Sequence, residues 1–219
     1  MRLTKIVSLV KGHTLLDIGT DHGYVLIDAL KSGRIEKGIA VEISEKPLSR
    51  AKSNAIAHQV DDKITFLLSD GFLNVTGSFD IVSITGLGFD TMKHILNQKH
   101  QIPNYYILST HSKVIELRKY LSENQFNITN EVLVYDKRFY SIIIAKKEEN
   151  VLSPEDILLS PILRHQTTSI PYYEQQLSKV NYIISKSTQK NKEALYFKKN
   201  TYENVLNYLK DKNKYKKSD

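Results

Sequence analysis

The sequence predicts an α/β fold, with a mainly parallel sheet covered by helices and a separate helical segment after it. Three observations lead to this prediction. Over the first two thirds of the 219 residues, strand-like and helix-like segments alternate, which is typical of a parallel sheet. A glycine-containing loop, "DIGTDHG", follows the first strand-like segment. After "KKEENVLSPED" the strand-like segments stop and only helical spacing remains.

The alternation can be followed along the chain. Residues 2–10 place apolar side chains at helical spacing, and Gly12 is expected to end that helix. Strands are then expected at 14–19, 37–43, 63–70, 79–86 and 105–110, with helices at 23–33, 47–60, 89–99 and 114–125. Residues 130–147 are expected to form an antiparallel hairpin. Five strands and a hairpin make seven, with the last one antiparallel, which favours the methyltransferase variant of the Rossmann-like fold over a dehydrogenase.

Residues 150–219 are expected to form a second, helical domain after a first domain of residues 1–149. A short helix is expected at 154–163. In 171–186 and 192–210, apolar residues recur at spacings typical of coiled-coil seams. The break "STQKN" between them would let the two helices fold back as a hairpin.

Lysines crowd the polar faces of these two helices. They are Lys179, Lys186, Lys190, Lys192, Lys198, Lys199, Lys210, Lys212, Lys214, Lys216 and Lys217. Between the first and last of them the only acids are Glu193, Glu203 and Asp211, so the positive excess of the chain, net +7, is concentrated here. A nucleic acid is the natural partner for such a surface. The alternative is a solvated face on two amphipathic helices.

Composition excludes several classes of protein. The chain has no cysteine, which rules out disulfides, thiolate zinc sites and methyltransferases that attack through a cysteine. The seven histidines show no metal-binding spacing, so no metal is expected. No run of about 18 apolar residues and no signal peptide is seen, so we expect a cytoplasmic protein that does not contact membranes.

The loop "DIGTDHG" differs from a pyrophosphate-binding loop. Gly19 and Gly23 would let a ligand approach the backbone closely, and a helix N-terminus favours an anionic group. Asp17 and Asp21 would repel a pyrophosphate but suit an ammonium group. S-adenosylmethionine carries both a carboxylate and an ammonium, and is therefore the ligand that this loop predicts.

Three later strand ends supply groups that would contact the remaining parts of S-adenosylmethionine. Glu42, at the end of "GIAVEI", is placed to accept hydrogen bonds from ribose hydroxyls. In "SDGF", Asp70 could accept from an adenine amino group and Phe72 could give apolar cover. The loop after "DIVSITG" would face the methyl group. The alternatives are a loop cap for Asp17, a solvated strand end for Glu42 and a plain turn at Asp70-Gly71.

These motifs, "DIGTDHGY", "EIS-KPL--A--N", "SDGF" and "TGLG", resemble the bacterial tRNA (adenine-N1)-methyltransferases of the TrmK family, which modify the adenine at tRNA position 22. The resemblance covers residues 1–147, and the helical hairpin fits the family's architecture. Two stretches differ. The chain has Thr85-Gly86-Leu87-Gly88-Phe89 where the family usually has Ala-Gly-Met-Gly-Gly, and Ser109-Thr110-His111 where it usually has Gln-Pro-Asn.

Motifs and resemblance together give an expected set of site residues. The expected cofactor-binding residues are Asp17, Gly19, Thr20, Gly23, Glu42, Ile43, Asp70, Gly71, Phe72, Thr85 and Gly86. The expected catalytic residues are Asp21, His22 and Tyr24, with Gly88, Phe89, Arg2, Lys5 and Arg34 on the substrate side. Packing under the sheet is the alternative for Tyr24, helix capping for His22, and a core position for Phe89.

The expected activity is transfer of a methyl group from S-adenosylmethionine to N1 of an adenine in tRNA, with S-adenosylhomocysteine as product and a monomeric enzyme. Adenine N1 has a free lone pair, so no base has to deprotonate it. The Asn/Asp-Pro-Pro-Tyr/Phe signature of exocyclic-amine methylation is missing after the fourth strand. The alternatives are a noncatalytic S-adenosylmethionine-sensing or RNA-binding protein, and a methyltransferase acting on another RNA, a protein or a small molecule.

Overall fold

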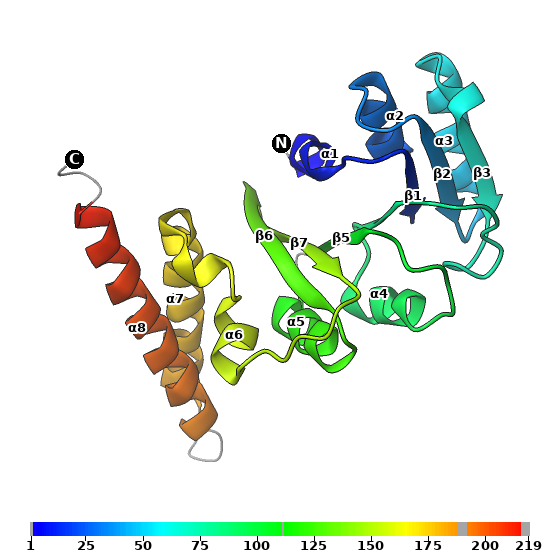
Figure 1. Cartoon of the computed structure of the whole chain (residues 1–219). Coiled ribbons are helices and arrows are strands. Elements are labelled where there is room, and N and C mark those ends of the chain that lie inside the picture. The colour runs from blue at the N-terminus through cyan, green and yellow to red at the C-terminus, as the bar shows by residue number, and fades with distance from the viewer. Residues whose placement is uncertain (1, 111, 188–191, 216–219) are drawn as a thin grey trace. The chain divides into compact units, whose positions relative to one another are not determined.

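The computed structural model describes residues 2–110, 112–187 and 192–215. Two compact units, Met1–Val151 and Leu152–Asp219, make up the chain (Figure 1). The sequence places the domain boundary at 149/150. His111, Lys190, Lys216, Lys217 and most of the "STQKN" break lie outside the described residues.

The first unit is built on one seven-stranded sheet with the order β3-β2-β1-β4-β5-β7-β6. The strands are β1 Thr14–Ile18, β2 Lys37–Glu42, β3 Ile64–Leu68, β4 Ile81–Thr85, β5 Tyr105–Thr110, β6 Asn127–Asp136 and β7 Arg138–Lys146. β7 pairs antiparallel with both β5 and β6, while β1 to β5 pair in parallel. The predicted fold class, including the antiparallel last strand, is confirmed.

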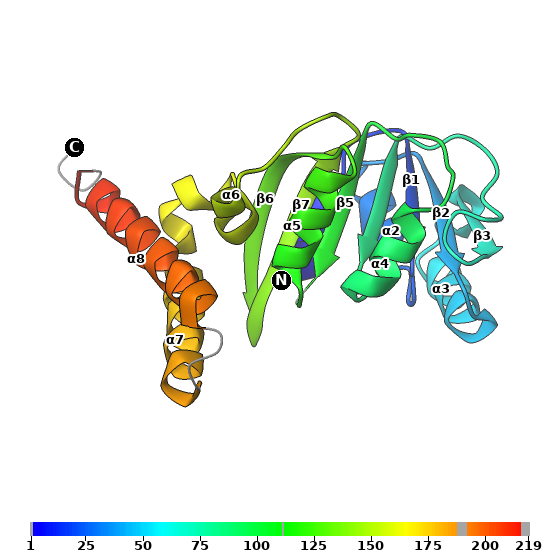
Figure 2. The same cartoon turned by 90° about the horizontal axis from the view of Figure 1, so that it is seen from below.

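Helices cover both faces of this sheet (Figures 1 and 2). They are α1 Arg2–Leu9, α2 Tyr24–Lys31, α3 Glu45–Ala57, α4 Phe89–Leu96 and α5 Val114–Glu123, with a 3₁₀ turn η1 at Asp61–Lys63. The first three helices pack on one face and α4 and α5 on the other. Every residue of β1 is buried, as expected of a central strand that is covered on both sides.

A buried ion pair ties α5 to the hairpin at the edge of the sheet. Arg118 of α5 and Glu131 of β6 are both fully buried, with Nη2 and Oε1 2.7 Å apart. Nε of Arg118 donates to Glu131 Oε2 at 3.0 Å, and the hydroxyl of Ser141 on β7 donates to the same carboxylate. Because each charge has lost its water, either one alone would be costly to bury.

The second unit is helical, with α6 Pro154–Leu159, the 3₁₀ turns η2 Leu163–His165 and η3 Thr167–Ser169, α7 Ile170–Lys186 and α8 Lys192–Tyr215. The helix expected at 154–163 is shorter than predicted, since Ser160 takes a φ of 78°. Pro161 follows Ser160, and a residue before proline avoids the helical region.

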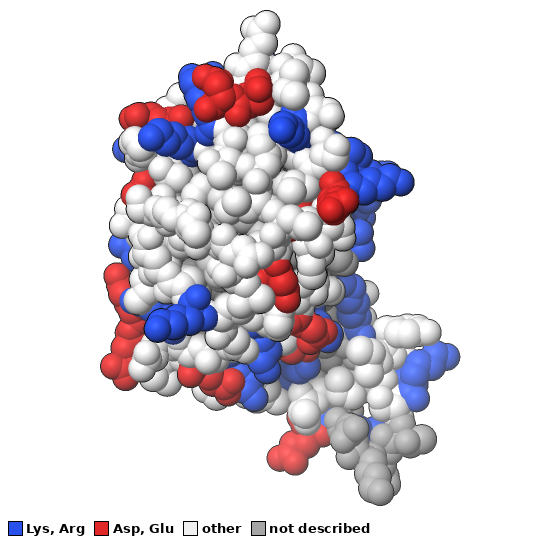
Figure 3. All heavy atoms as spheres, turned by 90° about the vertical axis from the view of Figure 1, so that its right-hand side faces the viewer, with Lys and Arg blue, Asp and Glu red and all other residues white. Residues whose placement is uncertain are grey.

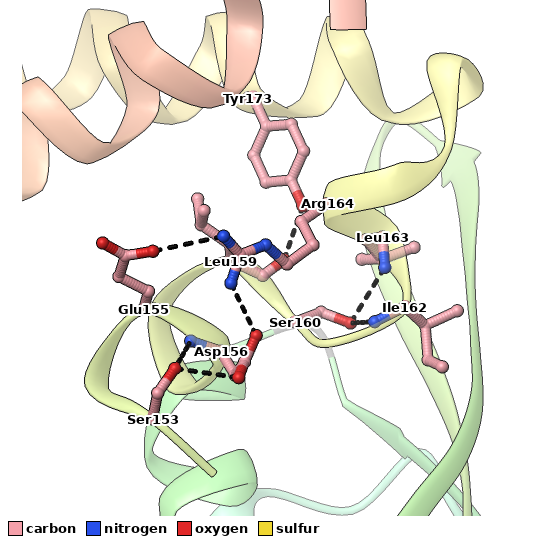
Figure 4. A network of polar contacts seen from close by, with 9 residues as sticks. All are labelled: Ser153, Glu155, Asp156, Leu159, Ser160, Ile162, Leu163, Arg164 and Tyr173. Atoms are coloured by element: carbon pink, nitrogen blue, oxygen red, sulfur yellow. Dashed lines mark hydrogen bonds and ion pairs between the residues drawn. The ribbon is translucent and has the colours of Figure 1, made fainter. Parts of the chain in front are cut away.

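Polar contacts fix the segment that enters this unit (Figure 4). The Ser153 hydroxyl accepts from the Asp156 N–H and caps α6. Arg164 then bonds Asp156 at 2.7 Å and Glu155 at 3.1 Å, while the Tyr173 hydroxyl of α7 donates to the Leu159 carbonyl. Eight apolar residues make up the seams expected in 171–186 and 192–210. Tyr173, Val180, Tyr202, Leu206 and Leu209 are buried, whereas Leu177, Ile184 and Leu195 are half-buried.

Within the residues described, no helix is long and apolar enough to cross a membrane, and no group of three or more His, Asp or Glu could hold a metal ion. On the face that Figure 3 shows, basic and acidic side chains are interspersed.

Candidate cofactor and substrate site

A cavity of about 470 Å³ opens at the carboxyl edge of the parallel strands, where ligands bind in open α/β sheets. The ends of β1, β2 and β4 meet there because these strands run side by side. The lining residues are Arg2, Asp17, Gly19, Thr20, Asp21, His22, Tyr24, Val25, Glu42, Pro47, Thr85, Gly86 and Leu87. Nine of the nineteen residues predicted for cofactor, catalysis or substrate are missing from this wall: Lys5, Gly23, Arg34, Ile43, Asp70, Gly71, Phe72, Gly88 and Phe89.

The loop between β1 and α2 depends on left-handed backbone conformations. Gly19 has a φ of 74°, Asp21 of 45° and Gly23 of 76°. Aspartate is among the few non-glycine residues that adopt this region readily. Gly23 serves packing as well, since a Cβ there would lie 3.3 Å from the Cβ of Ala51 on α3. A Cβ at Gly19 would lie 3.1 Å from the side chain of Leu87, and both of these residues belong to the cavity wall.

Asp17 is the buried carboxylate of the site. Only 2% of its surface is exposed, and its Oδ1 accepts a hydrogen bond from the Ser83 hydroxyl of β4. Burial raises the pKa of Asp17 from 3.8 to about 6, the Ser83 and Thr20 hydroxyls oppose this shift, and the charge of Glu42 adds to it. A carboxylate that is ionised at neutral pH without a cation beside it is suited to bind an ammonium group.

Glu42 and Thr20 complete the inner wall. Oε1 of Glu42 accepts the Asp21 backbone N–H at 2.8 Å and Oε2 accepts the Ile43 N–H at 3.2 Å, so the carboxylate holds both loops around the cavity. The Thr20 hydroxyl is buried and makes no hydrogen bond of normal geometry among the described residues, but it lies close enough to Asp17 to lower the pKa of that carboxyl. A ligand in the cavity would complete the hydrogen bonding of this hydroxyl.

The rim of the cavity carries Asp21, His22 and Tyr24. Asp21 Oδ1 lies 3.1 Å from Nη2 of Arg50 on α3, and its Oδ2 lies 3.4 Å from Nε2 of His22. The rings of His22 and Tyr24 stack with 5.8 Å between centroids and 12° between planes. Tyr24 is 43% exposed, so it does not pack under the sheet.

The segment after β3 is held by α4 and by the turn that follows this helix. Asp70 Oδ2 lies 3.0 Å from Nε2 of His94, and the Phe72 N–H donates to Gln98 Oε1 at 2.6 Å. Phe72 is buried and stacks on His100, with 3.8 Å between ring centroids. A ring held this way belongs to the core of the unit rather than to the cavity wall.

The remaining predicted residues lie elsewhere. Ile43 is 67% exposed, and Phe89 begins α4 with its ring edge against Tyr120. Gly88 precedes that helix, and Lys5 lies on α1. Arg34 donates to the carbonyls of Ser8 and Val10 at the end of α1 and therefore has a structural task.

Sequence reasoning did not find two residues that bond side chains of the site, Arg50 on Asp21 and Ser83 on Asp17. Arg50 lies at an unspecified position of "EIS-KPL--A--N" and Ser83 in the middle of "DIVSITG", so neither residue type stood out. The only available signal was helical spacing, which places Arg50 one turn before Asn54, and Asn54 donates to the His22 carbonyl.

Comparisons with known proteins agree with this geometry. The family model described as TrmK, tRNA (adenine(22)-N(1))-methyltransferase, matches residues 15–209. A relative from Mycoplasma pneumoniae is 31% identical over 187 residues, covering 78% of this chain and 85% of its own length. The tRNA (adenine(22)-N(1))-methyltransferase of Bacillus subtilis is 25% identical over 154 residues, covering 68% and 65%.

Solved structures are similar over nearly the whole chain. Streptococcus pneumoniae Sp1610 in complex with S-adenosyl-L-methionine has a TM-score of 0.83 and 25% identity, covering 94% of this chain and 98% of its own. M. capricolum TrmK in complex with S-adenosyl-homocysteine has a TM-score of 0.81 and 25% identity, covering 96% and 97%.

Proposed function

The chain belongs to the TrmK family of tRNA (adenine(22)-N(1))-methyltransferases, and from this membership we infer that it methylates N1 of an adenine in tRNA with S-adenosylmethionine. The resemblance that the sequence motifs carry is thereby confirmed. Position 22 of the tRNA is the proposed target. The single structural observation that supports the activity most is the Asp17, Thr20 and Glu42 wall at the carboxyl edge.

The residues present fit S-adenosylmethionine. Asp17 offers an anionic oxygen for the ammonium group, Glu42 offers carboxylate oxygens for ribose hydroxyls, and the Thr20 hydroxyl in the cavity wall offers one more contact. Gly19 and Gly86 have positive φ and add no side chain, so the cofactor can lie close to the backbone. When bound, the cofactor supplies a methyl group that the sulfonium already activates.

The reaction needs positioning more than acid–base chemistry. The N1 lone pair attacks the methyl carbon while the carbon–sulfur bond breaks, and the positive charge passes from sulfur to the adenine ring. We propose that the stacked His22 and Tyr24 rings hold the target base at the rim, after it has been drawn out of the tRNA. Asp21, beside them, would stabilise the charge that develops on the ring.

The lysines of α7 and α8 belong to the same proposal. They would bind tRNA phosphates without reading sequence, while the buried seams hold the two helices together. We further propose that the enzyme acts as a monomer in the cytoplasm, on tRNA substrate.

Calorimetry with S-adenosylmethionine and a methyl-transfer assay on tRNA together test the proposed function. We expect cofactor binding and incorporation of methyl groups into tRNA. Cofactor binding without incorporation would instead identify a noncatalytic S-adenosylmethionine sensor.

A further inference from the structure

The turn between β6 and β7 lies at the edge where the cavity opens, although no sequence motif marks it. Thr110, the last residue of β5, pairs with Ser141 of β7. Residues 138–140 therefore extend beyond the carboxyl end of β5. This edge of the sheet also carries the ends of β1, β2 and β4, which line the cavity.

Arg2 connects the cavity to this turn. It lines the cavity wall, and a Cβ added at Gly86 would lie 3.7 Å from its Nη2. The guanidinium carbon of Arg2 lies 4.7 Å from the centroid of the Tyr140 ring, within the range of a cation–π contact. One side chain thus spans from the end of β4 to β7.

A second guanidinium faces the same ring. The guanidinium carbon of Arg138 lies 5.4 Å from the Tyr140 centroid, and its Nε donates to the Tyr140 hydroxyl at 3.1 Å. Lys137 stands at the tip of the turn, and Asp136 is the one acid in residues 135–140. Tyr140 therefore contacts two cations, Arg2 in the cavity wall and Arg138 in a locally positive turn at the same edge of the sheet.

These two arginines differ from the others in the described chain. Arg50, Arg118 and Arg164 each bond a carboxylate. Arg34 donates to backbone carbonyls. For Arg2 and Arg138, the polar and ring contacts found among the described residues are the Tyr140 ring and its hydroxyl, so no carboxylate in the described part of the chain pairs with them.

We propose that Arg2 and Arg138, held in place by Tyr140, bind the tRNA phosphates that flank the methylated adenine. A nucleotide whose base enters the cavity must carry its backbone across this rim. Guanidinium groups match phosphate geometry, and a ring that orients them beforehand lowers the entropy lost on binding. The proposal rests on the proposed function and adds Tyr140 as a positioning residue and Arg138 as a substrate-binding residue.

The test measures steady-state methylation of tRNA between about 50 and 200 mM salt, with Arg138→Ala, Tyr140→Phe and the double variant. The control is Lys63→Ala. Lys63 is an exposed cation directly before β3, the outermost strand on the side of the sheet away from β6 and β7. For Arg138→Ala we expect the KM for tRNA to rise roughly tenfold, while kcat and cofactor affinity stay unchanged. The slope of log KM for tRNA against log salt concentration should become shallower by about one.

Tyr140→Phe keeps the ring but removes the hydroxyl that Arg138 bonds, so a smaller rise in KM is expected. Because this hydroxyl acts through Arg138, the double variant should match Arg138→Ala alone. The proposal is overturned if Arg138→Ala behaves like Lys63→Ala, or if the two effects add fully. A wild-type protein that leaves tRNA unmethylated would refute the proposed function instead.

Discussion

At the scale of single residues, Asp17 dominates the cofactor site because it is a carboxylate that folding has buried. Its pKa of about 6 in the folded chain lies above its ordinary value of 3.8. Folding therefore favours the protonated form, and the stability that this preference contributes is full below pH 3.8 and is lost as the pH rises to about 6. Compared with an aspartate whose pKa is the same in the folded and unfolded chain, ionised Asp17 lowers the free energy of unfolding at neutral pH by about 3 kcal/mol.

Asp17→Asn removes this cost and the proposed contact with the ammonium group together. At pH 8 we expect a higher melting temperature for the free protein and a cofactor Kd raised roughly 30- to 150-fold. In the wild type, cofactor affinity should fall as the pH drops below about 6. Thermal melts and calorimetry over pH 5 to about 8 measure both quantities. An unchanged affinity of the variant for the cofactor would show that Asp17 does not contact the cofactor.

Tyr24 is the residue whose role the structure narrows most, since its ring is exposed at the rim and stacked on His22. For Tyr24→Ala we expect kcat to fall at least tenfold while the cofactor Kd changes less than about twofold. Tyr24→Phe, which keeps the stacking surface, should retain most of the activity if stacking is its task. Single-turnover methylation and calorimetry separate the two effects, and equal losses in both would contradict this role.

The site could be predicted in part at this scale. Asp17, Thr20 and Glu42 stand directly at strand ends, and parallel strands bring such positions to one edge, so their meeting follows from sequence order. Phe72 also follows a strand, but its ring stacks on His100. The partner lies 28 residues away in a loop, and no periodic pattern reveals such a contact.

At the scale of elements, the order of strands and helices follows from the alternation along the chain, and only the bounds of some helices and strands differ. The hairpin expected from residue 130, for example, begins at Asn127. The packing of α4 could not be predicted, because His94 and Gln98 read as ordinary polar positions of an amphipathic helix. In the folded chain they hold Asp70 and the Phe72 backbone. The contact between α5 and β6 is similarly invisible in sequence.

The buried pair of Arg118 and Glu131 gives a stability prediction at this scale. Glu131→Gln removes the carboxylate charge that pairs with the buried guanidinium of Arg118, so the free energy of unfolding should fall by about 3–5 kcal/mol. Glu123→Gln, which breaks a pair with Lys119 on the surface of the same helix, should cost less than about 1 kcal/mol. Urea denaturation of both variants measures the two losses in the free energy of unfolding. A similarly small loss for both variants would show that the buried pair contributes little to stability.

At the scale of the whole molecule, the proposal gives cofactor binding to the first unit and tRNA binding to the lysines of the second. Lys179 and Lys186 lie on α7 and Lys198 on α8. Replacing all three by alanine should weaken tRNA binding and make its salt dependence shallower by up to about three units of slope, with cofactor affinity unchanged. A matched triple of Lys37, Lys52 and Lys63 in the first unit serves as control. Equal tRNA affinity in both triples would exclude α7 and α8 from the tRNA-binding surface.

The central claim is that this chain methylates N1 of an adenine in tRNA. It is tested most directly by treating unmodified tRNA with the protein and isotopically labelled S-adenosylmethionine, then mapping the labelled nucleosides by mass spectrometry. We expect the label in N1-methyladenosine, at position 22. Label on the exocyclic amine, on another nucleoside, or on no nucleoside would contradict the account.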